Sequence, residues 1–177
     1  MMRKVILALA VSLDGYIARA NGDVDWLSME DLTEASSEMT DFFASIDTIL
    51  WGRKTYVKGL ELGGDIGMYG KINNFVFSRT PQESKNENLQ FVSDDVKKFV
   101  ENLKQKDGKN IWLMGGGSLA KTFFEEKLID ELILGIQSKI IGRGIPLFLP
   151  HEGQTELELV DVKTRRSGTV QVTYRVK

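Results

Sequence analysis

A buried strand that runs straight into a helix is predicted by Ile111-Trp112-Leu113-Met114-Gly115-Gly116-Gly117-Ser118, with the helix continuing to about Glu126. Three successive residues without a Cβ atom cost chain entropy, so such a run is expected where the backbone lies against something bulky. A pyrophosphate at the start of the helix meets this requirement, because helix N-termini attract anions. A tight packing turn between strand and helix is the alternative. The run lacks the spacing of the Rossmann fingerprint and the lysine of a P-loop.

Strands and helices alternate on both sides of this segment. Hydrophobic patterning predicts further strands at Lys4–Val11, Thr48–Trp51, Asn74–Ser78 (closed by Pro81), Leu89–Val92 and Leu132–Ile136. It predicts helices at Glu30–Ser45 and Lys54–Leu60 and after an N-cap at Ser93, with loops at 12–28 and 63–67. The alternating segments Glu156–Lys163 and Thr169–Val176 predict an antiparallel hairpin. We therefore expect one α/β domain over residues 1–177, a three-layer α/β/α sandwich with a mainly parallel mixed sheet and a C-terminal antiparallel hairpin.

Composition excludes several classes of protein. The 177 residues carry a net charge of −2, which argues against a nucleic-acid partner. With no cysteine and only His151, thiolate catalysis and cysteine-ligated zinc are ruled out, and we expect no metal site. No stretch approaches the ~20 apolar residues of a membrane span. The run Val5–Val11 after Arg3 and Lys4 resembles a short signal peptide, but we favour a buried first strand and a cytoplasmic protein.

Two other strand ends carry residues suited to anions. Gly52, Arg53 and Thr55 follow one strand and open a helix, so a guanidinium and a hydroxyl stand at a positive helix end. Ser78 and Arg79 follow the next strand. Together with Arg53 they are suited to the 2′-phosphate of NADPH, since guanidinium groups bind phosphate strongly. The alternatives are a tight turn with solvated charges at 52–55 and an exposed loop arginine at 79.

These motifs, in this order along nearly the whole chain, resemble the pyrimidine reductase domain of bacterial riboflavin biosynthesis, a relative of dihydrofolate reductase. The segments that carry the resemblance are Val11–Ala18, Asp25–Leu27, Ile49–Tyr56, Asn74–Arg79, the glycines 115–117, Ile129–Leu132 and Ile141–Phe148. The resemblance implies a dihydrofolate reductase-like fold, a monomer or homodimer, and NADPH as cofactor. Tyr16 is a departure, because the riboflavin-pathway enzymes usually carry a basic residue there.

The resemblance also implies roles for individual residues. Gly52, Arg53, Thr55, Ser78 and Arg79 would hold the adenosine phosphate. The pyrophosphate would lie on the glycine turn and the helix start, at Gly115, Gly116, Gly117, Ser118 and Leu119. The nicotinamide would be lined by Ala10, Val11, Asp14, Gly15 and Ile17. A carboxylate on the first helix would face the substrate, which makes Glu38 a candidate and Asp41 the second choice, unless either is only an exposed helix acid.

We therefore expect an NADPH-dependent reductase that transfers hydride to a pterin- or pyrimidine-like heterocycle. The proton would come from water or from Glu38 or Asp14, whose pKa we expect burial to raise. Asp14 would otherwise only shape its turn. Trp26 and Tyr56 would line the substrate cleft, unless they pack in the core or in a lid. The alternatives are a dimeric NADPH-binding protein with little or no reductase activity and a binding module for another phosphorylated ligand.

Overall fold

The computed structural model describes residues 2–28, 36–62, 72–80 and 82–177. The strands are β1 (Val5–Ser12), β2 (Tyr16–Ala18), β3 (Ile46–Gly52), β4 (Asn73–Phe77), β5 (Leu89–Val92), β6 (Asn110–Gly115), β7 (Glu131–Gln137), β8 (Ile145–Pro146), β9 (Leu157–Thr164) and β10 (Val170–Val176). The helices are α2 (Ser36–Ser45), α3 (Arg53–Glu61), α4 (Val96–Gln105) and α5 (Gly117–Glu125). The first part of the predicted helix over Glu30–Ser45, the predicted loop 63–67 and the predicted strand stop at Pro81 lie outside the described residues.

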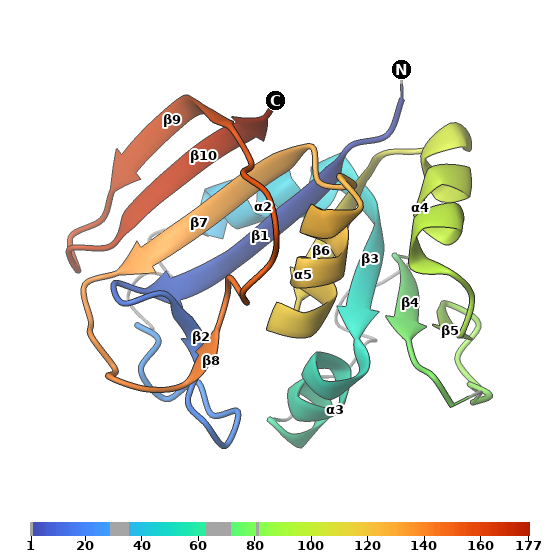
Figure 1. The fold of residues 1–177 in the computed structure, drawn as a ribbon, viewed down its shortest axis with the longest axis horizontal. Coiled ribbons are helices and arrows are strands. Elements are labelled where there is room, and N and C mark those ends of the chain that lie inside the picture. The colour runs from blue at the N-terminus through green and yellow to red at the C-terminus, as the bar shows by residue number, and fades with distance from the viewer. Residues whose placement is uncertain (1, 29–35, 63–71, 81) are drawn as a thin grey trace.

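One large sheet runs through the molecule in the order β5-β4-β3-β6-β1-β7-β10-β9. The strands from β5 to β7 in that order pair in parallel. β10 pairs antiparallel with β7, and β9 antiparallel with β10, so the C-terminal hairpin forms one edge of the sheet (Figure 1). The predicted mainly parallel sheet with an antiparallel hairpin is confirmed.

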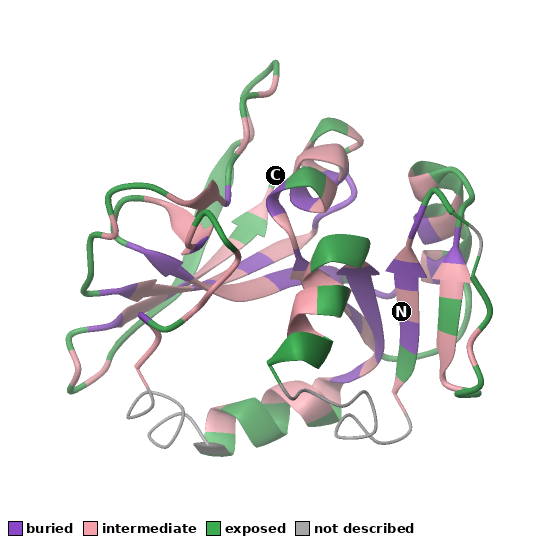
Figure 2. Ribbon diagram, turned by 90° about the horizontal axis from the view of Figure 1, so that it is seen from below, coloured by how far each residue is buried: buried purple, intermediate pink, exposed green. Residues whose placement is uncertain are grey.

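Helices cover both faces of this sheet, as the three-layer prediction requires (Figure 2). Alternate residues of a strand point to opposite faces, so the same strands supply two cores. On one face Val100 of α4 and Phe123 of α5 pack in a cluster with Leu113 of β6. On the other face Phe42 of α2 contacts Trp112 of β6 edge to face, with ring centroids 5.3 Å apart. The central strands are therefore apolar on both sides, as parallel strands usually are.

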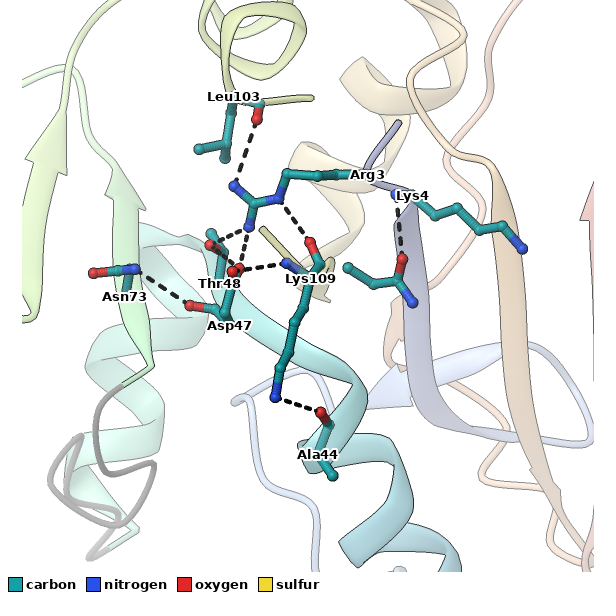
Figure 3. Close-up of polar contacts among 9 residues, drawn as sticks. Arg3, Lys4, Ala44, Asp47, Thr48, Asn73, Leu103 and Lys109 are labelled. Atoms are coloured by element: carbon teal, nitrogen blue, oxygen red, sulfur yellow. Dashed lines mark hydrogen bonds and ion pairs between the residues drawn. The ribbon is translucent and has the colours of Figure 1, made fainter. Parts of the chain in front are cut away.

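The apolar N-terminal run forms β1, the strand between β6 and β7, as we expected. At its start the side chain of Arg3 is 4% exposed and ties three strands together (Figure 3). Arg3 Nε donates to the carbonyl of Lys109 at 2.7 Å, and Nη2 donates to Asp47 and to the Thr48 hydroxyl. This network fixes the amino ends of the strands, leaving the carboxyl ends to form the candidate site.

The glycine run forms a tight junction between β6 and α5. Gly115 and Gly116 both have φ of +100°, a left-handed conformation that residues with a Cβ atom rarely adopt. A Cβ atom on Gly116 would lie 2.7 Å from Thr55 Oγ1, and one on Gly117 would lie 2.5 Å from the carbonyl oxygen of Pro146. The close packing of the chain therefore requires these glycines, whether or not a ligand also binds at this turn.

Two local predictions are wrong. α4 is capped by Asp95, whose carboxylate accepts a hydrogen bond from the backbone N–H of Lys98 at 2.9 Å, and not by Ser93. The predicted loop 12–28 contains β2, which pairs with β8 far along the chain, a long-range contact without a local signal. Among the described residues no helix is long and apolar enough to cross a membrane.

Candidate active site

A single groove of about 2220 Å³ lies at the carboxyl ends of the parallel strands. It is lined by the ends of β1, β3 and β6, by α2 and α3, by the start of α5, and by the faces of β7 and β10 that point toward α2. Its volume exceeds the ~300–1,000 Å³ typical of small-molecule pockets. The groove is therefore large enough for more than one small molecule.

Most of the predicted site residues line this groove. They are Ala10, Ile17, Gly52, Arg53, Thr55, Ser78, Arg79, Gly116, Gly117, Ser118 and Leu119 of the predicted cofactor site, together with Glu38 and Tyr56. Five predicted residues are not among those lining it: Val11, Asp14, Gly15, Gly115 and Trp26. The strand-end motifs are thus brought together in space, although they are distant in the sequence.

The arginine end of the groove, which we define as Arg53, Ser78 and Arg79, is suited to an anion. Arg53 is the first residue of α3, and its Nη1 lies 3.3 Å from the hydroxyl of Ser78, a residue that is only 6% exposed. Within the described ranges, neither guanidinium forms an ion pair with an acidic side chain. Two exposed guanidinium groups without an acidic partner, beside a buried hydroxyl, have the donor chemistry that phosphate groups require.

The starts of α3 and α5 lie against each other at the groove. Thr55 Oγ1 donates to the carbonyl of Gly115 at 3.3 Å, and a Cβ atom on Gly52 would lie 3.2 Å from the same carbonyl oxygen. No described side chain caps either helix, since the N-cap positions are Gly52 and Gly116. Two positive helix ends are therefore presented side by side without a capping acceptor, which favours an extended anion such as a pyrophosphate.

Asp14 anchors a turn. Its carboxylate accepts hydrogen bonds from the Ser12 hydroxyl (2.6 Å) and from the backbone N–H groups of Ile141 (3.2 Å) and Gly142 (2.7 Å). These bonds, that from Ser12 foremost, lower the pKa of Asp14 from its ordinary value. The expectation of a pKa raised by burial is wrong here, and at neutral pH the carboxyl group is ionised.

Glu38 lies in the first turn of α2 and forms a two-pronged ion pair across the groove. Arg165 Nη1 donates to Glu38 Oε1 at 3.0 Å, and Arg165 Nη2 donates to Oε2 at 2.8 Å. This contact lowers the pKa of Glu38, again opposite to the expected direction. Asp41, the second choice, also lines the groove and is exposed.

The two predicted aromatic residues are placed differently. Tyr56 lines the groove and contacts Trp51 and Phe91 edge to face, with ring centroids 6.3 and 5.8 Å apart. Trp26 is 3% exposed, and its carbonyl accepts a hydrogen bond from Lys139 Nζ at 2.7 Å. Trp26 is therefore a packing residue of the described structure, the alternative that the sequence left open.

Several groove residues are not among those predicted from the sequence, and they include Gly135 of β7, Gln171 of β10 and Arg165 after β9. A glycine inside the apolar run Leu132–Ile136 is a signal for Gly135, because strand interiors disfavour glycine. Gln171 and Arg165 carry no such local signal. No group of three His, Asp or Glu side chains in the described part of the chain is arranged to hold a metal ion.

Comparison with known proteins identifies relatives over the full length. The model of the RibD C-terminal domain family matches residues 3–61 and 70–172. The uncharacterized protein YyaP of Bacillus subtilis (strain 168) is 38% identical over 97% of this chain and 94% of its own. Among solved structures, a putative riboflavin biosynthesis protein from Shewanella sp. PV-4 has a TM-score of 0.84 at 26% identity, covering 100% of this chain and 99% of that one. A diaminohydroxyphosphoribosylaminopyrimidine deaminase/5-amino-6-(5-phosphoribosylamino)uracil reductase from Thermotoga maritima has a TM-score of 0.74 at 17% identity, covering 99% of this chain and 57% of that one.

Proposed function

The chain belongs to the RibD C-terminal domain family, and from that premise we propose that it is an NADPH-dependent reductase of a pterin- or pyrimidine-like heterocycle. The observation that carries the proposal is the arginine end of the groove, where Arg53 and Arg79 stand beside the buried Ser78. The Thermotoga maritima protein of the same fold supports it, since it is a 5-amino-6-(5-phosphoribosylamino)uracil reductase by name. Because NADPH is regenerated inside the cell, we place the protein in the cytoplasm.

The groove residues fit NADPH in three places. Arg53, Ser78 and Arg79, with Gly52 and Thr55, would hold the adenosine 2′-phosphate. The start of α5, from Gly116 to Leu119, would hold the pyrophosphate through its free N–H groups. Ala10 and Ile17 would line the nicotinamide, and Asp14 would keep the turn at Gly15 in place.

Bound NADPH would supply the hydride. Because Glu38 and Asp14 are ionised at neutral pH, neither is a ready proton donor. We therefore assign the proton to water that reaches the open groove. The chain's own contribution is then to bind and orient the two reactants, which alone can accelerate a reaction by several orders of magnitude.

Substitution of the two arginines tests the cofactor assignment. Arg53→Ala and Arg79→Ala should each weaken NADPH binding roughly 10- to 100-fold, the range of a single charge-assisted contact. Binding of NADH, which lacks the 2′-phosphate, should be weakened much less. Arg143→Ala is the control, because Arg143 is an exposed arginine that does not line the groove. Dissociation constants from fluorescence titration with both cofactors measure the difference, and equal losses for NADPH and NADH would remove these residues from the 2′-phosphate.

A second function is favoured by the state of the two acids. Asp14 is engaged in a turn and Glu38 in an ion pair, so the chain resembles a cofactor-binding protein with little or no reductase activity. Stopped-flow measurement of NADPH oxidation with a panel of pterins and aminopyrimidines separates the two. Tight NADPH binding without turnover of any of these substrates would favour the binding protein.

A further inference from the structure

Two residues with little or no side chain lie next to each other on neighbouring strands of the groove. On the face toward α2, Ala10 of β1 lies directly opposite Gly135 of β7 in the sheet register. Central strands of parallel sheets normally carry branched apolar side chains. Gly135 does not have a positive φ, and a Cβ atom there would approach only Ala10 Cα, at 3.9 Å. Among the described residues, neither backbone conformation nor packing requires this glycine, so the space above Ala10 and Gly135 is available to a ligand.

A fixed polar edge borders this area. Gln171 of β10 is the cross-strand neighbour of Gly135 on the side away from Ala10. Its Oε1 accepts a hydrogen bond from Arg165 Nη2 at 3.2 Å. Because a guanidinium has only donors, the oxygen of the amide must face Arg165 and the NH2 group must point elsewhere. No hydrogen bond from that NH2 group is found among the described residues.

Arg165 is itself held in place. Its side chain is 7% exposed, and its fork binds both oxygens of Glu38. A buried guanidinium needs a compensating carboxylate and a fixed geometry, and the bidentate pair supplies both. The direction of the Gln171 amide on β10 is therefore set by contacts between separate segments. Glu38 of α2 holds Arg165 in the turn after β9, and Arg165 holds the amide oxygen.

We propose that Gly135 forms a platform for the flat ring of the substrate, with Ala10 at the border between that ring and the nicotinamide. The Gln171 amide donates a hydrogen bond to a carbonyl or ring nitrogen at the edge of the substrate ring. Glu38 and Arg165 are positioning residues that orient Gln171. This assignment rests on the proposed function, because it presumes a heterocycle beside the nicotinamide. It gives Glu38 a role different from that of a proton donor.

Calorimetric titration of the NADP⁺-saturated protein with two probes, 5,6-diaminouracil and folic acid, tests the platform. We expect the wild type to bind at least one probe. Gly135→Val should weaken binding of that probe at least roughly 10-fold, because the valine side chain fills the platform. Gln171→Leu should weaken its binding about 5- to 10-fold, because one hydrogen bond is removed. Thr173→Val is the matched control on the same face of β10, opposite Ile133, and should have little effect. Thermal unfolding of each variant without ligand confirms that it is folded.

The positioning roles have their own test. If Arg165 acts through Gln171, Arg165→Lys should weaken binding of the probe to an otherwise wild-type protein. In a protein that already carries Gln171→Leu, it should not weaken probe binding further. Glu38→Gln should show the same dependence. Additive losses would mean that Arg165 and Glu38 act independently of the amide, and would overturn their assignment.

The outcomes separate this assignment from the proposed function. Failure of the wild type to bind NADP⁺ would overturn the proposed function. Normal NADP⁺ binding without binding of either probe, or a Gly135→Val variant that binds its probe as the wild type does, would overturn the platform while leaving the cofactor assignment intact.

Discussion

The arginine side chains that line the groove differ in whether an acidic side chain pairs with them. Arg53 and Arg79 are exposed and have no acidic partner in the described part of the chain, whereas the side chain of Arg165 is 7% exposed and bound to Glu38. An uncompensated guanidinium is available to an anionic ligand, and a compensated one is available to orient neutral groups. The groove is therefore suited to a phosphate-bearing cofactor at the arginine end and to an uncharged ring near Arg165.

The ion pair between Arg165 and Glu38 predicts a pH-dependent stability. Arg165 holds the pKa of Glu38 below its ordinary value of 4.5, which it regains on unfolding. A carboxyl group with a depressed pKa stabilises the folded state above its unfolded pKa, and that contribution disappears as the pH falls through the folded pKa. Glu38→Gln should therefore lower the free energy of unfolding at pH 7, and the difference from wild type should shrink progressively below about pH 4.5.

Urea unfolding of both proteins at several pH values between 7 and 3 measures this difference. Glu158→Gln is a control, since Glu158 pairs with Arg175 at 3.2 Å on an exposed surface, where ion pairs contribute little. A difference between Glu38→Gln and wild type that stays constant over this range would show that the ion pair does not stabilise the fold through the charge of Glu38.

Elements show where sequence patterns predict structure and where they do not. The glycine turn after β6 and the hairpin β9–β10 are local features, so composition and alternation over a few residues predict them. The start of α4 is harder to predict, because Ser93, Asp94 and Asp95 are all residue types that favour N-caps. The contact of Arg165 with Glu38 joins residues 127 positions apart, and no local pattern carries such information.

The cap of α4 can be tested with a matched pair of substitutions. Asp95→Ala removes the carboxylate that accepts the Lys98 N–H and should lower the free energy of unfolding by about 1 kcal/mol. Ser93→Ala should have a much smaller effect, because Ser93 lies outside the helix and does not cap it. Chemical denaturation measures both, and a larger loss for Ser93→Ala would place the helix start two residues earlier than the structure does.

At the scale of the whole molecule, we propose that the sheet edge formed by β9 binds a second copy of the chain. β9 is the last strand of the sheet order and lies at the rim of the molecule (Figure 1). Its apolar side chains Leu157, Leu159, Val160 and Val162 are 41%, 55%, 51% and 48% exposed. Exposed apolar residues on an edge strand mark an interaction surface or an aggregation hazard. A homodimer, which the family resemblance left open, would cover them.

The charges along β9 indicate how two copies would meet. Glu158 lies near the start of the strand and Lys163 near its end, so an antiparallel arrangement about a two-fold axis brings opposite charges of the two copies together. We therefore expect the wild type to sediment as a dimer, and Val162→Lys or Leu159→Lys to sediment as a monomer. Ile140→Lys is the control, because Ile140 is 72% exposed but outside β9. Analytical ultracentrifugation measures the oligomeric state. A monomeric wild type, or a dimer that persists in both lysine variants, would show that β9 is not a dimer interface.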